Sequence, residues 1–295
     1  MPVTVVPGTA TAEVETRFLY REARLLQWAG RHSEAAEKLA ELTAKERESP
    51  QPLLQLNASL RATGQTVAAE ERLQSALTGA FAGRRAIWEL WAAISLAELN
   101  RSPIEVLAKL PQPDGAGTER GPVQDLRWLL EQLRNGGVIR IRCGGGEHQG
   151  SDGEVWGSDR FFSGGHEVGK VWIGGTSDSF PGEVTGTGGI GEPALYKKHR
   201  WFPKEQYLAP GYRIPLPRGT YEVRLHFAEL FWAAPGLRRF DVLIEGQEAL
   251  KDHDVFATVG FATAEAHQFE SAVNDGVLEI TLVPRVDCPM VSAIA

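Results

Sequence analysis

The stretch "RLHFAELFWAAPGLRRFDV" (residues 224–242) decides how the second half of the chain is interpreted. It begins with the polar–apolar alternation of a half-buried strand, and the alternation stops at Phe231 and Trp232. Neighbouring strand residues point to opposite faces, so two adjacent rings cannot both enter one core from a regular strand. A turn follows at Pro235 and Gly236. The pattern therefore predicts that the strand has ended and that a loop carrying exposed aromatic side chains has begun.

Residues 138–295 around this stretch also indicate β structure. The alternating segments are "VIRIRC" (138–143), "GTYEVRLHF" (219–227), "RFDVLIEG" (239–246), "HQFESAV" (267–273) and "GVLEITLV" (276–283). Turn residues separate them, and no helical pattern intervenes, which favours an antiparallel β-sandwich. Tyr221 and Phe227 fall on the apolar face of their strand. His226 falls on the opposite face, and we expect it and His199 to lie on a solvated face.

The first part of the chain is rich in Ala, Leu and Glu, and its apolar residues recur at helical spacing rather than alternating as in a strand. The segments "AGRHSEAAEKL" (29–39) and "TGQTVAAEERL" (63–73) match at an offset of 34 residues, with Gly30 aligned to Gly64. Each glycine separates two helix-like runs, so each unit is a helix–turn–helix hairpin. A period of 34 residues resembles that of tetratricopeptide repeats. This resemblance covers residues 13–110 and implies an α-solenoid. A third, degenerate copy is expected in "WELWAAISLAELNRSPIEVLAKL" (88–110), with Asn100 at the turn.

Residues 1–12 are expected to be a disordered tail. The segment "PQPDGAGTERGP" (111–122) has the composition of a flexible linker. Residues 123–136 have leucines at helical spacing, and they predict a connecting helix that Gly136 ends. The chain is thus predicted to be a multidomain α and β protein, with helical repeats before a β-sandwich.

The charge of the chain argues against two classes of partner. Its formal net charge is −7 and it has no basic block, which disfavours binding to nucleic acid. No apolar run approaches the roughly 18 residues that a membrane span needs, so no membrane insertion is expected. The first residues lack the pattern of a secretory signal, which favours the cytoplasm. In that compartment Cys143 and Cys288 are expected to be buried thiols, although they could pair if the first and last strands of the β half are neighbours.

Familiar catalytic patterns are absent or out of context. "GTGGIG" (186–191) has the letters of a dinucleotide-binding loop, but Pro193 and the β context predict no helix behind it. Glycoside hydrolysis needs two carboxylates held across a cleft, and no pair is marked out by spacing. Glu229 and Asp241 are interpreted as structural acids, and Trp156 with Asp159 as a pair that staples a loop. No metal cluster appears and no cofactor is expected. The sequence predicts a protein that is not an enzyme.

The β half resembles the malectin domain, a carbohydrate-binding β-sandwich of jelly-roll type, across residues 138–295. The segments that carry the resemblance, in order, are "IRIRCGGGE" (139–147), "VWGSDRFFSGG" (155–165), "ALYKKHRW" (194–201), "YRIPLPRGTYEVRLHFAELFW" (212–232), "GLRRFDVLIEGQEALKDHDV" (236–255) and "VDCPMVSAI" (286–294). One position departs from the family's "YxxERW", because His199 replaces the acid.

The resemblance implies a sugar site at one end of the sandwich, with aromatic rings flanking a disaccharide and an aspartate binding its hydroxyl groups. Carried over by position, the candidate residues are Trp201, Phe231, Trp232 and Asp287, with Phe180 or Trp172 as the source of a further ring. Flat rings stack on the C–H face of a pyranose, and a carboxylate accepts bonds from two adjacent hydroxyls. Three of them have structural alternatives: Phe231 could cap the core, Trp201 could pack at a loop base, and Asp287 could cap a turn.

The sequence therefore predicts non-catalytic binding of a di- or oligosaccharide of glucose type, with the helical repeats binding a partner protein. Two alternatives have no sugar ligand. In one, the β domain is a scaffold that binds peptide or protein. In the other, the chain is a regulatory fragment of a larger multidomain protein.

Overall fold

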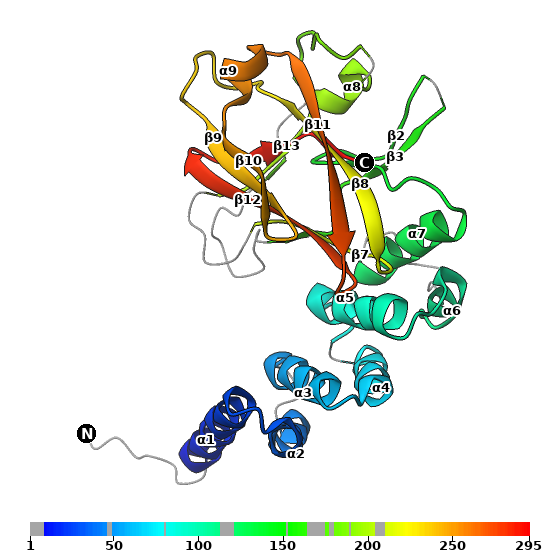
Figure 1. Cartoon of the computed structure of the whole chain (residues 1–295), viewed down its shortest axis with the longest axis vertical. Helices are drawn as coiled ribbons and strands as arrows, with labels where there is room; N and C mark the ends of the chain where they lie inside the picture. The colour runs from blue at the N-terminus through cyan, green and yellow to red at the C-terminus, as the bar shows by residue number, and fades with distance from the viewer. Residues whose placement is uncertain are drawn as a thin grey trace, which may run out of the picture. The chain divides into compact units, whose positions relative to one another are not determined.

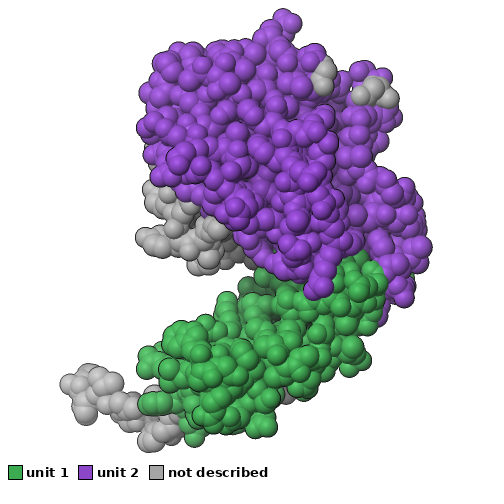
Figure 2. Space-filling view, in the orientation of Figure 1, with its two compact units in different colours: residues 1–101, 111–126 green, residues 102–110, 127–295 purple. Residues whose placement is uncertain are grey.

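The computed structural model describes residues 9–45, 49–79, 81–112, 121–151, 153–163, 175–176, 180–188, 190–203 and 210–295. The chain divides into two compact units (Figure 2). They comprise residues 1–101 with 111–126, and residues 102–110 with 127–295. Helices make up the first unit, and strands dominate the second (Figure 1). Within the described ranges, no helix is both long and apolar enough to cross a bilayer.

The helices of the first unit follow one another through short turns. They are α1 (Thr9–Trp28), α2 (His32–Lys45), α3 (Gln51–Ala62), α4 (Thr66–Ala76), α5 (Arg85–Ala93) and the π-helix η1 (Ile94–Glu98). Three further helices are α6 (Pro103–Ala108), α8 (Pro193–Tyr196) and α9 (Val255–Val259), while α7 (Pro122–Arg134) spans the boundary between the units. The short helix α8 follows the glycines of residues 186–191, where no helix was expected; its four residues form a single turn inside the β unit.

The two matching sequence segments form matching turns. Gly30 and Gly64 both adopt the left-handed conformation, with φ of 74° and 76°. In each turn the amide that follows the glycine donates to the carbonyl five residues back, at 2.8 Å in both. This is the Schellman arrangement, which glycine favours because it has no Cβ. The positions that pack behind the turns have no exposed surface in either copy: Ala35, Ala69, Leu39 and Leu73. The sequence period of 34 residues is therefore a structural period as well.

The third turn differs in a defined way. Asn100 has φ of 49°, and the amide after it donates to a carbonyl six residues back rather than five. The π-helix η1 lies immediately before it, so one extra residue is accommodated in the last helical turn. Asn tolerates the left-handed conformation better than most residues other than glycine. The degenerate copy is thus a helix–turn–helix whose first helix is widened at its end.

The described strands of the second unit form three sheets. Its strands are β1 (Ile141–Arg142), β2 (His148–Gln149), β3 (Val155–Ser158), β4 (Phe162–Ser163), β5 (Gly175–Thr176), β6 (Arg200–Trp201), β7 (Gly211–Pro215), β8 (Gly219–Ala228), β9 (Arg239–Ile244), β10 (Gln247–His253), β11 (Ala264–Val273), β12 (Val277–Val286), β13 (Met290–Val291) and β14 (Ala293–Ile294). The sheets have the orders β11-β8-β14-β1-β3-β2, β10-β9-β12-β7-β4 and β13-β6-β5. Every pairing of named strands is antiparallel except β1 with β3, which is parallel.

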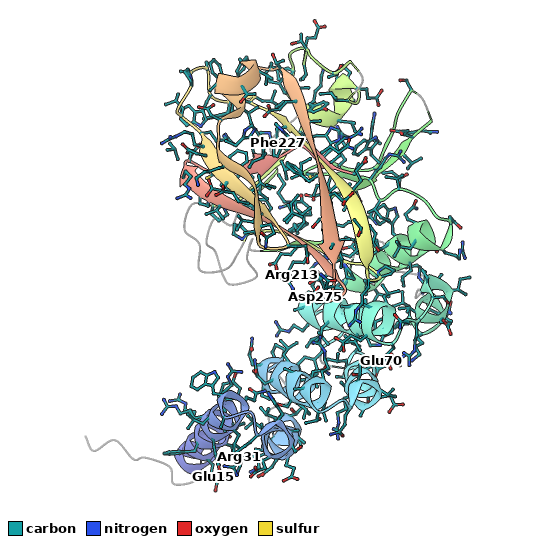
Figure 3. All side chains as sticks on the ribbon, in the orientation of Figure 1. Glu15, Arg31, Glu70, Arg213, Phe227 and Asp275 are labelled. Atoms are coloured by element: carbon teal, nitrogen blue, oxygen red, sulfur yellow. The ribbon has the colours of Figure 1, made fainter. Side chains whose placement is uncertain are left out.

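The alternation along β8 sets the core. Val223, Leu225 and Phe227 are buried, and Phe227 (labelled in Figure 3) contacts the ring of Phe240 on β9, with centroids 5.8 Å apart. Side chains of the six-stranded and five-stranded sheets therefore pack against each other. The opposite face of β8 begins polar, with Glu222 exposed, as the alternation predicts.

The two histidines expected on a solvated face are buried, so that prediction is wrong. A second apolar cluster, which includes Trp156, Leu195 and Tyr196, covers the outer face of β8. His226 accordingly has only 1% of its surface exposed and shares a hydrogen bond with Tyr196 Oη through Nδ1, at 2.8 Å. His199 is buried as well. Alternation identifies the face of a strand on which a residue lies but not what covers that face.

Both cysteines lie in the second unit, and they form no disulfide. Cys143 is buried, and burial raises the pKa of its thiol well above the ordinary value. Cys288 is half-buried. The expectation that both thiols are buried is right only for Cys143.

Candidate functional site

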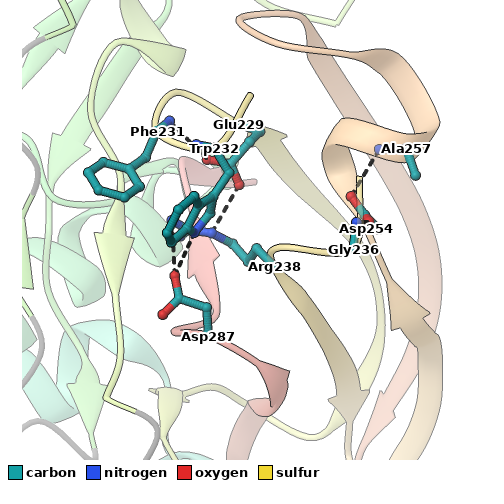
Figure 4. Close-up of polar contacts among 8 residues, drawn as sticks. All are labelled: Glu229, Phe231, Trp232, Gly236, Arg238, Asp254, Ala257 and Asp287. Carbon is teal, nitrogen blue, oxygen red and sulfur yellow. Dashed lines mark hydrogen bonds and ion pairs between the residues drawn. The ribbon is translucent and has the colours of Figure 1, made fainter. Parts of the chain in front are cut away.

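The loop after β8 is anchored by one buried carboxylate (Figure 4). Glu229 Oε1 accepts hydrogen bonds from the backbone amides of Phe231 and Trp232, at 2.9 and 3.0 Å. Its Oε2 forms an ion pair with Arg238 Nε at 2.9 Å. Glu229 is 1% exposed, so its charge is balanced inside the protein rather than by water. The prediction that Glu229 is a structural acid is confirmed, and its bonds explain why the chain leaves the strand here.

The same loop is fixed at its far side. The amide of Gly236 donates to Asp254 Oδ2 at 2.5 Å, and Asp254 Oδ1 accepts from the amide of Ala257 as the N-cap of α9 (Figure 4). Gly236 has φ of 81°, a conformation that disfavours any residue with a side chain. The loop between Glu229 and Gly236 is therefore held at both ends.

The two adjacent rings have different environments. Phe231 is 70% exposed, whereas Trp232 is half-buried. Their rings are perpendicular, at 89°, with centroids 4.8 Å apart. This edge-to-face contact is a favourable arrangement of two aromatic quadrupoles. Phe231 therefore does not cap the core, and its ring faces solvent while Trp232 supports it.

Asp287 joins this group from the end of β12. Trp232 Nε1 donates to Asp287 Oδ2 at 2.7 Å, and Arg238 Nη2 lies 3.9 Å from the same oxygen. The backbone of Asp287 is left-handed, with φ of 59°, which short polar residues tolerate. Three of the predicted site residues, Phe231, Trp232 and Asp287, thus lie together, although they are far apart in the sequence (Figure 4).

Trp201 lies on β6, which pairs with β13. The register places Trp201 opposite Met290, three residues after Asp287. Trp201 is half-buried. It is therefore linked to the Asp287 segment through the small three-stranded sheet.

The remaining two candidates have different outcomes. Phe180 packs edge to face against Phe261, with centroids 5.8 Å apart, and Phe261 forms a β-bridge with Glu229. Phe180 thereby reaches the vicinity of the Glu229 loop through an intermediate ring. Phe261 is 42% exposed and was missed by the sequence analysis, although a single ring after Gly260 in a loop is a weak signal for such a position. Trp172 lies outside the described residues.

His199 stands where the family's motif has an acid, and this replacement affects how the charge of Arg238 is balanced. Burial lowers the pKa of His199 to about 3, and the positive charge of Arg238 acts in the same direction. His199 is therefore neutral at ordinary pH. Because it contributes no negative charge, the charge of the buried Arg238 is balanced by Glu229 and Asp287. Arg238 was also missed in the sequence, where nothing distinguishes it from Arg239.

The other acids considered in the sequence are engaged in structural contacts. Asp159 accepts hydrogen bonds from the amide of Gly144, from Arg200 Nε and from Tyr212 Oη, at 2.8, 2.5 and 2.9 Å. Burial raises the pKa of Asp159, and these partners oppose the rise. Asp159 staples its loop through these partners, whereas its expected companion Trp156 belongs to the outer apolar cluster. Asp241 binds Arg285 and the amide of Asp252, as a structural acid.

A cavity of about 580 Å³ lies in a different place, on the outer face of the six-stranded sheet. Residues that line it include Arg140, Glu154, Trp156, Glu192, Arg224 and His226. Of the predicted site residues that the structure describes, none lines it. Trp156 is 4% exposed and presents little ring surface there. Its described lining has mixed charges, and among those residues no ring presents the open face that stacking on a sugar requires.

The chain matches known proteins in its second half. The malectin domain family matches residues 137–294. Malectin from Homo sapiens is 34% identical over 71 residues, which are 24% of this chain and 24% of that protein. Malectin-B from Xenopus laevis is 34% identical over 71 residues, covering 24% of this chain and 26% of that protein. A probable LRR receptor-like serine/threonine-protein kinase from Arabidopsis thaliana is 36% identical over 81 residues, covering 24% of this chain and 8% of that protein.

The chain thus spans about a quarter or less of these relatives. Among solved structures, the ANXUR2 extracellular domain from Arabidopsis thaliana has a TM-score of 0.46 and 16% identity, over 53% of this chain and 47% of that chain. A Bacteroides uniformis β-glucuronidase has a TM-score of 0.43 and 16% identity, over 53% of this chain and 17% of that chain. Because the family match extends over more than half of the 295 residues, the chain belongs to the malectin domain family, whose fold binds carbohydrate.

Proposed function

We propose that the second unit binds a di- or oligosaccharide of glucose type, without catalysis, at the rim formed by Phe231, Trp232 and Asp287. The observation that carries the proposal is an exposed ring held beside a carboxylate. Phe231 is 70% exposed, and Trp232 contacts both Phe231 and Asp287. The edge-to-face contact with Trp232 holds the Phe231 ring at the surface, where a ligand can reach it.

The three side chains have separate roles in this proposal. Phe231 offers a flat apolar surface to the C–H face of a pyranose, a contact that contributes about 0.5–1.5 kcal/mol beyond area burial. Asp287 accepts hydrogen bonds from sugar hydroxyls, and charged acceptors form the stronger bonds. Trp232 positions both, through its ring edge and its indole nitrogen. Trp201, on the strand next to the Asp287 segment, would supply a second surface, and Phe180 would act through Phe261.

The first unit is proposed to be a short solenoid of tetratricopeptide-type hairpins that binds a partner protein. The repeated glycine turns and the matching buried Ala and Leu positions support this interpretation. Phe18, Leu25 and Trp28 of α1 are 66%, 60% and 75% exposed, and their spacing puts them on one helix face. Such a face suits an apolar helix of the partner. In the same way, the contacts between the two larger sheets support a jelly-roll sandwich for the second unit.

Binding of the full chain to an array of glucose-type di- and oligosaccharides tests the sugar proposal. Phe231→Ala and Asp287→Asn should weaken binding to the selected glycan. Asn also tolerates the left-handed backbone at position 287, so the fold should persist. Trp28→Ala is the matched control, because Trp28 is an equally exposed ring in the helical unit.

Two outcomes would contradict the proposal. In the first, both rim variants bind the glycan as tightly as the parent chain. In the second, no glycan binds, while a peptide library yields a ligand that requires Phe231. The second result would establish the rival function, a scaffold that binds peptide or protein.

A further inference from the structure

Two histidines and a glutamate meet where the two larger sheets have their edges. His253 ends β10, which is the edge strand of the five-stranded sheet. Glu265 and His267 lie on β11, which is the edge strand of the six-stranded sheet. Residues two apart on a strand lie on the same face of that strand, so Glu265 and His267 both lie on the face of β11 that contains the cluster. The cluster therefore connects the two sheets at their open side.

The ligand atoms of the three residues lie close enough together to share one metal ion. One ligand atom from each residue can be chosen so that all three lie within 4.8 Å of one another. Glu265 Oε1 is 2.5 Å from His253 Nε2, and Glu265 Oε2 is 3.3 Å from His267 Nε2. Zinc binds such atoms at roughly 2.0–2.2 Å, which separates two ligands of a tetrahedron by roughly 3.3 Å. A small movement of the His253 ring would complete this geometry.

One nitrogen of the cluster lacks a hydrogen bond. His267 Nε2 is buried and, although it faces Glu265, has no hydrogen-bond partner within the described part of the chain. A buried polar atom without a partner is costly, and a metal ion would satisfy it. Glu265 faces both imidazoles, one with each carboxylate oxygen, but only the contact with His253 has the geometry of a hydrogen bond.

The surroundings are apolar. The ring of Phe227 lies 5.7 Å from His253 and 6.2 Å from His267, and Phe240 lies 5.8 Å from His253. Phe269 stacks on His267 at 6.4 Å. Weak competition from water strengthens the attraction of a carboxylate for a cation. The side chain of His267 is 29% exposed, which leaves a route for an ion and for a water ligand.

We propose that His253, Glu265 and His267 bind a divalent transition-metal ion of the zinc type, which ties the edge of one sheet to the edge of the other. Two imidazoles and one carboxylate suit zinc and disfavour calcium and magnesium, which prefer sites made of oxygen alone. Three protein ligands leave a fourth position for water. The site is separate from the rim of Phe231, Trp232 and Asp287, so it does not depend on the sugar proposal.

The test uses the full chain, stripped with a chelator and titrated by calorimetry with zinc sulfate, then with magnesium and calcium chloride. We expect one equivalent of zinc and no binding of the other two ions. At a zinc concentration of 100 times Kd, the midpoint of thermal unfolding should rise by roughly 5–10 °C. His267→Gln should weaken zinc binding at least tenfold. His148→Gln is the matched control, because His148 pairs with Glu192 without a second histidine.

A variant that fails to fold would not decide the question, so a second measurement uses the parent chain. Zinc should protect His253 and His267, but not His148, from acylation by diethyl pyrocarbonate, as mapped by mass spectrometry. The proposal is overturned if zinc leaves the midpoint unchanged and protects neither histidine. It is also overturned if folded His267→Gln binds zinc as tightly as His148→Gln. In either case the cluster is a set of hydrogen bonds alone.

Discussion

Glu70 in the helical unit and Glu229 in the β unit are both buried carboxylates with an arginine partner, but they serve different ends. Glu70 Oε1 accepts from Trp91 Nε1 at 2.9 Å and from Ser95 Oγ at 3.3 Å, and it lies 2.7 Å from Arg101 Nη1 (Glu70 is labelled in Figure 3). All of these contacts hold helices together.

Glu229 binds two loop amides and Arg238, and its contacts lead to an exposed ring and to Asp287. The comparison shows how the same chemistry can have two uses. The described hydrogen bonds of Glu70 all go to groups inside the helical unit, so its contribution is to stability. Where the bonds end on a surface loop, the carboxylate fixes the shape of that surface.

The largest expected effect is that of Glu70→Ala. Removing one partner of a buried ion pair leaves Arg101 without its charge partner and costs about 3–5 kcal/mol. Calorimetry of thermal unfolding should show a lower midpoint for the helical transition. Glycan binding to the β unit should persist at a temperature where both units are folded. Loss of glycan binding by a folded Glu70→Ala chain would show that the two networks do not have separate functions.

Glu229→Gln should have a smaller effect on stability and a larger one on the site. The amide oxygen can still accept from the loop, but the ion pair with Arg238 is lost, at a cost of about 1–3 kcal/mol. Asp287 is then the remaining described carboxylate partner of Arg238, so the Asp287 carboxylate should move toward Arg238. Glycan binding should fall as a result. Urea unfolding and glycan titration measure the two effects. If stability drops while affinity is unchanged, Glu229 is purely structural, like Glu70.

Acid should weaken the β unit through its buried histidines. Burial lowers the pKa of His199 to about 3 and that of His226 to about 4, with Arg238 and Arg224 acting in the same direction. Both values lie below the ordinary pKa of about 6.5, so the unfolded chain binds more protons as the pH falls from about 6.5 toward these values. Stability should therefore fall over this range, by at most about 1.4 kcal/mol per pH unit for each histidine.

Urea unfolding at pH 7, 6 and 5 checks this dependence. The variant His226→Asn removes one of the two buried histidines. It should therefore reduce the slope of the free energy of unfolding against pH, even if it lowers stability at pH 7. A curve of unchanged slope would show that another group controls the acid response.

Phe231→Ala should have the smallest effect on stability. Since the ring is 70% exposed, its removal should change the free energy of unfolding by no more than about 0.5 kcal/mol. Glycan affinity should fall by about 0.5–1.5 kcal/mol, or roughly 2- to 12-fold. Thermal unfolding and glycan titration of the same sample separate the two quantities. A clear loss of stability would place Phe231 among the packing residues and remove the contrast with Glu70.

Local patterns were reliable wherever the outcome depended on neighbouring residues. The glycines at 30 and 64 and the break of alternation at Phe231 could be interpreted directly, because backbone conformation and strand faces are local properties. The malectin resemblance likewise extended over most of the β unit. His199 and His226 were misjudged because the side chains that bury them come from segments distant in sequence. Arg238 and Phe261 were missed for the same reason.

The sequence by itself determined the two kinds of structure, the 34-residue period and the identity of the rings after β8. Only the tertiary structure decided which ring faces solvent, that Trp232 donates to Asp287, and that His253 meets Glu265 and His267 at the edges of two sheets. Periodicity reports on the faces of one element at a time. Contacts between elements depend on register, loop geometry and burial, which are set by the chain as a whole.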